Sequence, residues 1–293
     1  MATPAQWLEG ARPRTLPAAV APVVAGTGVA LHVGEAVWWK AGLALLVALT
    51  LQVAVNYAND YSDGVRGTDR DRVGPQRLVG SGAASPRAVK AAAFAAFGTA
   101  VVAGFLLALT TSWWLVPAGL VCMGAAWFYT GGSKPYGYRG LGEVMVFVFF
   151  GLVAVMGTTY VQTETLTGPA LLPSLWAAVG VGALASAILV ANNLRDIPTD
   201  RATGKHTLAV VLGEERTRAA YLLLVAAAAV ALVALAFATA AAALLGLVFL
   251  AVALPAARAV LGGASGLDLV PVLQRTGLAE LLYAVGVFVG LLV

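Results

Sequence analysis

Hydrophobic residues occur along this chain in long runs, and the short segments between the runs hold most of the charged residues. A helix needs about 20 apolar residues to cross the hydrocarbon core of a bilayer. Nine runs approach this length, so the pattern predicts nine membrane-spanning helices. They are Leu16–Val33, Trp38–Ala58, Ala88–Leu109, Trp113–Thr130, Leu141–Gln162, Leu172–Asn192, Ala219–Thr239, Ala240–Leu261 and Val272–Val293. The seventh and eighth runs are nearly contiguous, so a count of eight is an open alternative.

The composition indicates the same class of protein. Of 293 residues, 60% are hydrophobic and only 11% are charged, whereas a soluble domain carries about 25% charged residues. Cys122, His32 and His206 are isolated from one another, which leaves no cysteine- or histidine-based metal site. The chain has no basic surface with interleaved aromatic residues, so nucleic acid is not expected as a partner. We expect an all-α polytopic membrane protein whose residues 1–293 form a single domain in the lipid bilayer.

The basic residues predict how the chain is oriented. With nine helices, 17 of the 18 lysines and arginines fall on the side that holds the N-terminus, and only Lys40 falls on the other. Cytoplasmic loops of membrane proteins carry an excess of Lys and Arg. The segments that contain these 17 residues should therefore face the cytoplasm, with the protein spanning the cell membrane many times.

Two groups of acidic and amide residues lie at the predicted cytoplasmic ends of the second and sixth helices. In the first, Asn56, Asp60 and Asp63 have the spacing i, i+4 and i+7, which is one face of a helix. Asn192 and Asp196 begin the second group with the same four-residue spacing. Proline breaks or kinks a helix interior, so Pro198 predicts that the last member, Asp200, lies just past the helix end.

A carboxylate held near hydrocarbon is energetically unfavourable, so carboxylates at the ends of membrane helices usually have a function. Two oxygen-rich faces at one membrane depth are suited to Mg²⁺, which takes carboxylate and water oxygens and completes its shell with substrate phosphates. The candidate metal ligands are Asn56, Asn59, Asp60, Asp63, Asp69, Asn192, Asp196 and Asp200. The same loops supply basic side chains that suit a diphosphate, namely Arg66, Arg77, Arg201 and Lys205. Each arginine also has a simpler explanation as a topological signal of a cytoplasmic loop.

Two motifs resemble those of the UbiA superfamily of intramembrane aromatic prenyltransferases, and the resemblance covers essentially the whole chain. N-D-Y-S-D (Asn59–Asp63) is similar to the N-D-x-x-D core of the family's first Asp-rich motif. D-I-P-T-D (Asp196–Asp200) is similar to the D-x-x-x-D of its second. Gly67 stands where the strictest first motif has a third aspartate, and Asp69 is the candidate substitute. The resemblance implies a nine-helix UbiA-type bundle with an Asp-rich site on its cytoplasmic side.

Other segments are most similar to the branch of that superfamily that prenylates 1,4-dihydroxy-2-naphthoate in menaquinone synthesis. They are Trp7–Thr27 and Gly74–Gly82, whereas Y-T-G-G-S-K (Tyr129–Lys134) resembles the loop after the fourth helix of the superfamily as a whole. This likeness implies Mg²⁺ as cofactor, polyprenyl diphosphate as donor, and loss of CO₂ from the naphthoate ring. The implied catalytic residues are Asp60, Asp63, Asp196, Asp200 and Lys205. Lys134 would contact the diphosphate, and Tyr129, Arg12 and Arg14 would contact the acceptor, whose carboxylate suits a guanidinium.

Three alternatives compete with this interpretation. Within the superfamily, acceptors of the 4-hydroxybenzoate or homogentisate type are open on physical grounds. D-Y-S-D-G (Asp60–Gly64) opens like the motif of CDP-alcohol phosphotransferases, but Gly67-Thr68 stands where that motif requires A-R. A secondary transporter would place its polar site near the membrane midplane, where Glu280 is the main ionisable residue. The one-sided acidic groups favour an enzyme.

Overall fold

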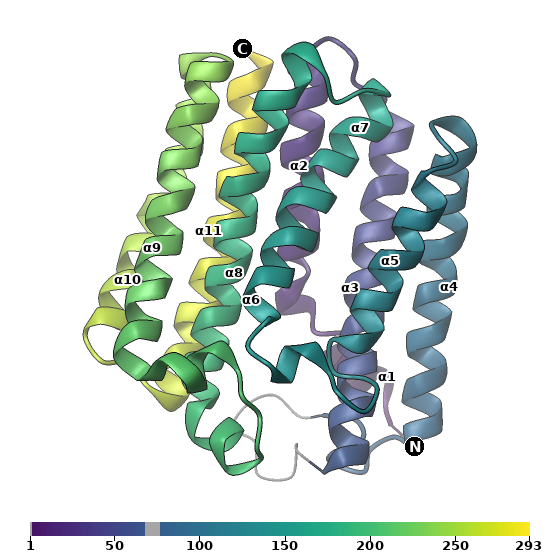
Figure 1. Ribbon diagram of the computed structural model, residues 1–293, viewed down its shortest axis with the longest axis vertical. Helices are drawn as coiled ribbons and strands as arrows, with labels where there is room; N and C mark the ends of the chain where they lie inside the picture. The colour runs from purple at the N-terminus through teal and green to yellow at the C-terminus, as the bar shows by residue number, and fades with distance from the viewer. Residues whose placement is uncertain (1, 68–76) are drawn as a thin grey trace.

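The computed structural model describes residues 2–67 and 77–293, and these form a bundle of helices aligned with its long axis (Figure 1). Asp69, a candidate metal ligand, lies outside the described residues. The first half of the chain contains α1 (Pro4–Gly10), η1 (Pro13–Thr15), α2 (Pro17–His32), α3 (Trp38–Arg66), α4 (Pro86–Thr110), α5 (Leu115–Phe128) and η2 (Tyr136–Tyr138). The second half contains α6 (Gly142–Val146), the π-helix η3 (Phe147–Met156), α7 (Gly157–Thr163), η4 (Gly168–Ala170), α8 (Leu171–Ala202), α9 (Leu208–Ala238), η5 (Ala241–Phe249), α10 (Leu250–Leu261), η6 (Gly266–Asp268) and α11 (Leu269–Leu292).

The course of the chain agrees with the nine predicted crossings. Within the described residues, seven helices are long and apolar enough to cross a membrane. An eighth crossing is the pair Pro4–Thr15 and Pro17–His32, which is bent by 47°. α5 is shorter, but it is apolar and runs between α4 and the segment before α6 (Figure 1). This is a multi-pass membrane protein.

Two helices continue well beyond the ends that hydrophobicity predicts. α3 runs on to Arg66 and α8 to Ala202, so both acidic groups lie on helices rather than in loops. The prediction that Pro198 puts Asp200 past the end of its helix is wrong, because α8 continues through the proline. The last turn is held by other bonds: the Thr199 hydroxyl donates to the Asp196 carbonyl at 2.9 Å, and the Lys205 amide donates to the Asp200 carbonyl at 2.8 Å. These contacts offset the single backbone bond that a proline removes.

Small residues let the inner helices approach closely. The main hydrophobic core is built largely from α8, α9, α10 and α11. We compared the most apolar stretch of each long helix. The buried share of that stretch is 72% in α8 and 56% in the span that contains α11, but only 33% in α3 and in α4. A Cβ atom on Gly151 would lie 2.7 Å from the Cα of Gly182, which is closer than real side chains allow. α8 and α11 are therefore inner helices, whereas α3 and α4 belong to the outer ring.

The two ends of the bundle differ in charge. α3 and α8 both finish at the lower end in Figure 1, close to the segment that joins α5 to α6, and we call this the site end. At the other end, Lys40 lies in the first turn of α3, and its ammonium lies 2.7 Å from the Glu164 carboxylate and 3.0 Å from the Thr110 carbonyl. The one basic residue expected on the opposite side is thus buried and paired.

Candidate active site

Asp60 in the first acidic group holds a neighbouring loop in place. Its carboxylate is fully buried and accepts hydrogen bonds from the backbone amides of Leu78 and Val79, at 2.8 and 2.9 Å. The preceding residue, Asn59, accepts a hydrogen bond from the Thr130 hydroxyl at 2.7 Å. The end of α3 is therefore tied both to the segment before α4 and to the segment after α5.

Asp63 joins three parts of the chain at the site end. It accepts a short hydrogen bond from the Tyr138 hydroxyl, and the Lys205 ammonium lies 3.7 Å from the same carboxylate oxygen. The ammonium also lies 4.6 Å from the centre of the Tyr138 ring, a distance suited to a cation–π contact. The Tyr138 carbonyl accepts from the His206 amide at 3.1 Å. One tyrosine thus connects the first group on α3 with the loop that follows the second group on α8.

Arg66 completes this cluster from the last turn of α3. Its guanidinium donates short hydrogen bonds to the carbonyls of Thr130 and Gly132 and lies 5.5 Å from the Tyr138 ring centre. Next to it, a cavity of about 230 Å³ lies between α3 and the end of α5, lined in part by Tyr61 and Trp127. The structure therefore brings together Asp63, Arg66 and Lys205 from the predicted site.

In the second acidic group, an arginine is paired with an aspartate. Arg195 contacts both carboxylate oxygens of Asp196, from Nε and Nη2, each at 2.7 Å. Its Nη2 also donates to the amide oxygen of Asn192 at 2.9 Å. At the end of α8, the Asp200 carboxylate accepts from the Thr207 hydroxyl at 3.3 Å.

Tyr129 lies between the two acidic groups. Burial and the Glu143 carboxylate raise the pKa of its hydroxyl above the usual value. Tyr136, Asp63 and Asp200 raise the same pKa further, so charges from both groups reach this side chain. The Tyr129 and Tyr136 rings meet edge to face at 5.5 Å, and burial raises the pKa of Tyr136 to about 12. Both hydroxyls stay protonated at neutral pH and remain hydrogen-bond donors.

The N-terminal segment packs on the first acidic group. The side-chain amide of Asn56 donates to the Ala11 carbonyl at 2.9 Å and to the Thr15 hydroxyl at 3.0 Å. Arg12 returns a bond from its guanidinium to the Asn56 carbonyl at 3.3 Å, whereas Arg14 is exposed. Asn56 therefore anchors this segment, and its assignment as a metal ligand stays a prediction.

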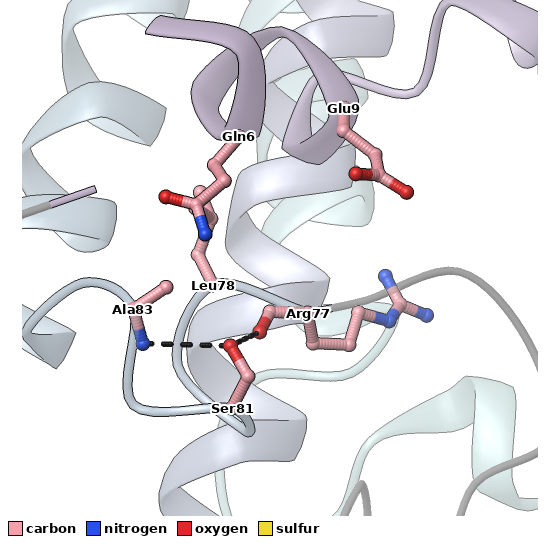
Figure 2. A pocket seen from close by; sticks show the side chains of 6 residues that line it. All are labelled: Gln6, Glu9, Arg77, Leu78, Ser81 and Ala83. Atoms are coloured by element: carbon pink, nitrogen blue, oxygen red, sulfur yellow. Dashed lines mark hydrogen bonds between the residues drawn. The ribbon is translucent and has the colours of Figure 1, made fainter. Parts of the chain in front are cut away.

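The remaining predicted diphosphate contacts are spread around the site end. Lys134 and Arg201 are exposed. Arg77 is largely buried and, with Glu9 and Leu78, lines a narrow pocket between α1 and the loop before α4 (Figure 2). In that loop the Ser81 hydroxyl donates to the Arg77 carbonyl, as the dashed line shows.

Comparison with known proteins identifies the family of this chain. Residues 19–265 match the model of the UbiA prenyltransferase family. The chain belongs to this family. A relative from Mycobacterium tuberculosis, named 1,4-dihydroxy-2-naphthoate octaprenyltransferase, is 55% identical over 98% of this chain and 97% of its own length. The superfamily resemblance carried by the two Asp-rich motifs is confirmed.

Solved structures of UbiA homologs confirm the predicted all-helical fold. One from Aeropyrum pernix K1 superposes with a TM-score of 0.71 at 20% identity, covering 93% of this chain and 96% of that one. Another, from Archaeoglobus fulgidus and bound to GPP and Mg²⁺, gives a TM-score of 0.71 at 15% identity, covering 98% of this chain and all of that one. These likenesses extend over nearly the full length of this UbiA family member.

The donor atoms at the site end suit Mg²⁺ shared with a substrate. Among the described residues, no group of three or more His, Cys, Asp or Glu side chains is close enough to hold a metal ion unaided. Mg²⁺ in phosphate-handling sites usually takes only one or two carboxylates, with substrate oxygens and water completing its shell. Asp63 and Asp196 each face a protein cation, Lys205 and Arg195, which indicates two carboxylates arranged to receive positive charge.

Two residues of this UbiA family member's site were not predicted from the sequence. Tyr138 follows the predicted Tyr129–Lys134 segment closely, and its sequence signal was the second half of Y-T-G-G-S-K-P-Y-G-Y. Arg195 directly precedes Asp196, and its position in the sequence indicates only a cytoplasmic segment. Both are revealed by contacts between side chains rather than by spacing.

Proposed function

We propose that this protein transfers a polyprenyl group from polyprenyl diphosphate to 1,4-dihydroxy-2-naphthoate, releasing diphosphate and CO₂ and forming demethylmenaquinone. The observation that carries this proposal is the 55% identity, over nearly the whole chain, to a relative named for this acceptor. The proposed location is the cell membrane, with the site end facing the cytoplasm and residues 1–293 acting as one intramembrane prenyltransferase domain. The excess of basic residues in the segments at that end supports the orientation.

The cations around Asp63 are suited to bind the donor's diphosphate. The charged groups of Lys205 and Arg66 both lie against the Tyr138 ring. Both side chains can donate hydrogen bonds to phosphate oxygens. As the allylic C–O bond of the donor breaks, negative charge grows on the departing diphosphate. Fixed donors at that point stabilise the transition state more than the bound substrate, which is the condition for a faster reaction.

Mg²⁺ is the proposed cofactor, with Asp63 and Asp196 as its principal ligands and Asn59, Asp60, Asn192 and Asp200 as further candidates. When bound, it would supply Lewis-acid neutralisation of the diphosphate charge. Asp60 also has a structural role, which the family motif alone does not indicate. Its carboxylate accepts hydrogen bonds from the backbone of the loop before α4. A structure of a family homolog with GPP and Mg²⁺ supports the choice of metal.

The position of the site at one end of the bundle suits this pair of substrates. A polyprenyl tail is apolar and stays within the bilayer, whereas a diphosphate belongs at the aqueous boundary. We propose that Tyr129 keeps its proton and donates a hydrogen bond to the acceptor. Arg12, whose guanidinium already bonds to the Asn56 carbonyl on α3, is the better placed of the two N-terminal arginines to meet the acceptor's carboxylate. Arg14 is exposed and stays a prediction.

The test uses the purified protein in detergent with Mg²⁺, a polyprenyl diphosphate, and either 1,4-dihydroxy-2-naphthoate or 4-hydroxybenzoate. Released diphosphate and CO₂ are both measured. We expect both products with the naphthoate alone, and no turnover after chelation of the metal until Mg²⁺ is restored. Asp196→Ala should abolish turnover, whereas Asp268→Ala, which removes an exposed carboxylate, should not. Diphosphate release with 4-hydroxybenzoate and without CO₂ would keep the family chemistry and overturn the proposed acceptor.

A further inference from the structure

The contacts of Arg195 leave little room for a second cation at the second acidic group. Both oxygens of Asp196 receive a hydrogen bond from this guanidinium at 2.7 Å. The Asn192 side chain is engaged as well, because its oxygen accepts from Arg195 at 2.9 Å and its nitrogen donates to Asp196 at 3.3 Å. A metal ion that takes the Asp196 carboxylate therefore has to compete with the guanidinium for the same oxygens.

Burial makes this competition consequential. Arg195 is 7% exposed and Asp196 is 9% exposed. Separating a buried ion pair leaves an uncompensated charge, which is strongly unfavourable unless a new partner of opposite sign is present. A guanidinium displaced from Asp196 therefore needs another anion within reach of its side chain.

The first acidic group shows a weaker version of the same arrangement. The Lys205 ammonium is 3.7 Å from Asp63, compared with the 2.7 Å contacts between Arg195 and Asp196. Each acidic group thus carries a protein cation, and the cation on the second group is held by two parallel contacts. Such paired contacts are the stronger and more directional form of an ion pair.

We propose that Arg195 is an exchangeable cation: it occupies Asp196 in the metal-free protein and moves to the donor's diphosphate when Mg²⁺ binds. This inference rests on the proposed diphosphate chemistry of the site. The fork of a guanidinium matches two phosphate oxygens as well as it matches a carboxylate, so the displaced side chain recovers its paired contacts on the substrate. Mg²⁺ alone then binds poorly, since it must leave Arg195 without an anion. Mg²⁺ and a diphosphate bind well together, because Mg²⁺ takes the Asp196 carboxylate while the diphosphate takes the displaced Arg195 guanidinium.

The exchange predicts that one substitution changes two affinities in opposite directions. We would titrate the full-length protein in detergent by calorimetry, first with Mg²⁺ alone and then with inorganic pyrophosphate at saturating Mg²⁺. Arg195→Gln removes the competing charge and the diphosphate contact together. From the usual strength of hydrogen bonds to charged groups, Mg²⁺ alone should bind at least about tenfold more tightly than to the wild type, and pyrophosphate at least about tenfold more weakly. A residue that only stabilises the fold would not strengthen metal binding.

Arg218→Gln is the matched control, since it removes a partly buried guanidinium that bonds to the Val260 carbonyl on α10 and to Glu214 on its own helix, α9. It should leave both affinities within about threefold, a change of only about 0.7 kcal/mol. Should Arg195→Gln fail to fold, Arg195→Lys decides. A lysine keeps the charge but cannot make the paired contact with either partner, so Mg²⁺ alone should bind more tightly than to the wild type and pyrophosphate more weakly, each by less than in Arg195→Gln.

An unchanged or weaker affinity for Mg²⁺ alone in the folded variants would overturn the exchange, as would unchanged pyrophosphate binding in Arg195→Gln. These outcomes are separate from those of the proposed function. A protein that shows the two opposite changes but prenylates no naphthoate would support the exchange and refute the acceptor.

Discussion

Asp60→Ala offers the sharpest test of how the first acidic group is built. The Asp60 carboxylate accepts from two backbone amides, those of Leu78 and Val79, and is fully buried. A hydrogen bond to a charged group contributes about 1.5–3 kcal/mol. Alanine removes both bonds and leaves two buried N–H groups without that acceptor. The segment that follows residue 76 should therefore open more readily by about 3–6 kcal/mol, the sum of the two bonds.

Hydrogen exchange measured by mass spectrometry reads this opening directly. Every 1.4 kcal/mol corresponds to about a tenfold change in an opening equilibrium, so amide exchange in peptides covering residues 77–85 should accelerate by roughly 10² to 10⁴. Asp63→Ala is the matched control, since Asp63 contacts the Tyr138 hydroxyl and the Lys205 ammonium. Both variants should lose prenyl transfer, but only Asp60→Ala should loosen the segment. Wild-type exchange rates in Asp60→Ala would refute the inference that this carboxylate holds the loop.

Three further predictions test other parts of the structure. Tyr138→Phe keeps the ring against Lys205 but removes the hydroxyl donated to the first acidic group, so kcat/KM for prenyl transfer should fall about tenfold with the fold retained; an unchanged rate would exclude the hydroxyl from the site. Lys205→Ala should raise KM for the polyprenyl diphosphate about tenfold, whereas Lys134→Ala at an exposed position should change it little. Gly182→Leu forces a side chain against Phe147 and should lower Tm in detergent by about 5 °C, which a thermal melt would detect.

The crossings could be predicted because a bilayer imposes a length on every helix. The ends of α3 and α8 could not, since their last turns leave the apolar region and are held by specific polar contacts. Asp60 and Asp63 continue α3 beyond the predicted end at Ala58. At Pro198, local preference predicted a helix end, and bonds from Thr199 and Lys205 kept the helix intact.

Helical spacing predicts part of the candidate site but not the contacts that Arg195 and Tyr138 make there. It grouped Asn56 with two aspartates on one face, but in the structure the Asn56 side chain serves the N-terminal segment. Adjacent residues on a helix do not normally face each other, so the contact between Arg195 and Asp196 is invisible to a spacing argument. Tyr138 reaches Asp63 only because the segments after α5 and α8 meet in the folded bundle.

The unequal burial of the helices has a consequence for how the sequence can change over generations. α3 and α4 present much of their surface to acyl chains, which accept one apolar side chain as well as another. α8 lies among other helices, where a change of one methylene group alters the packing. We therefore expect apolar replacements to accumulate on the outer helices and to be purged from α8. The two halves of the site would then evolve at different rates around a fixed set of polar residues.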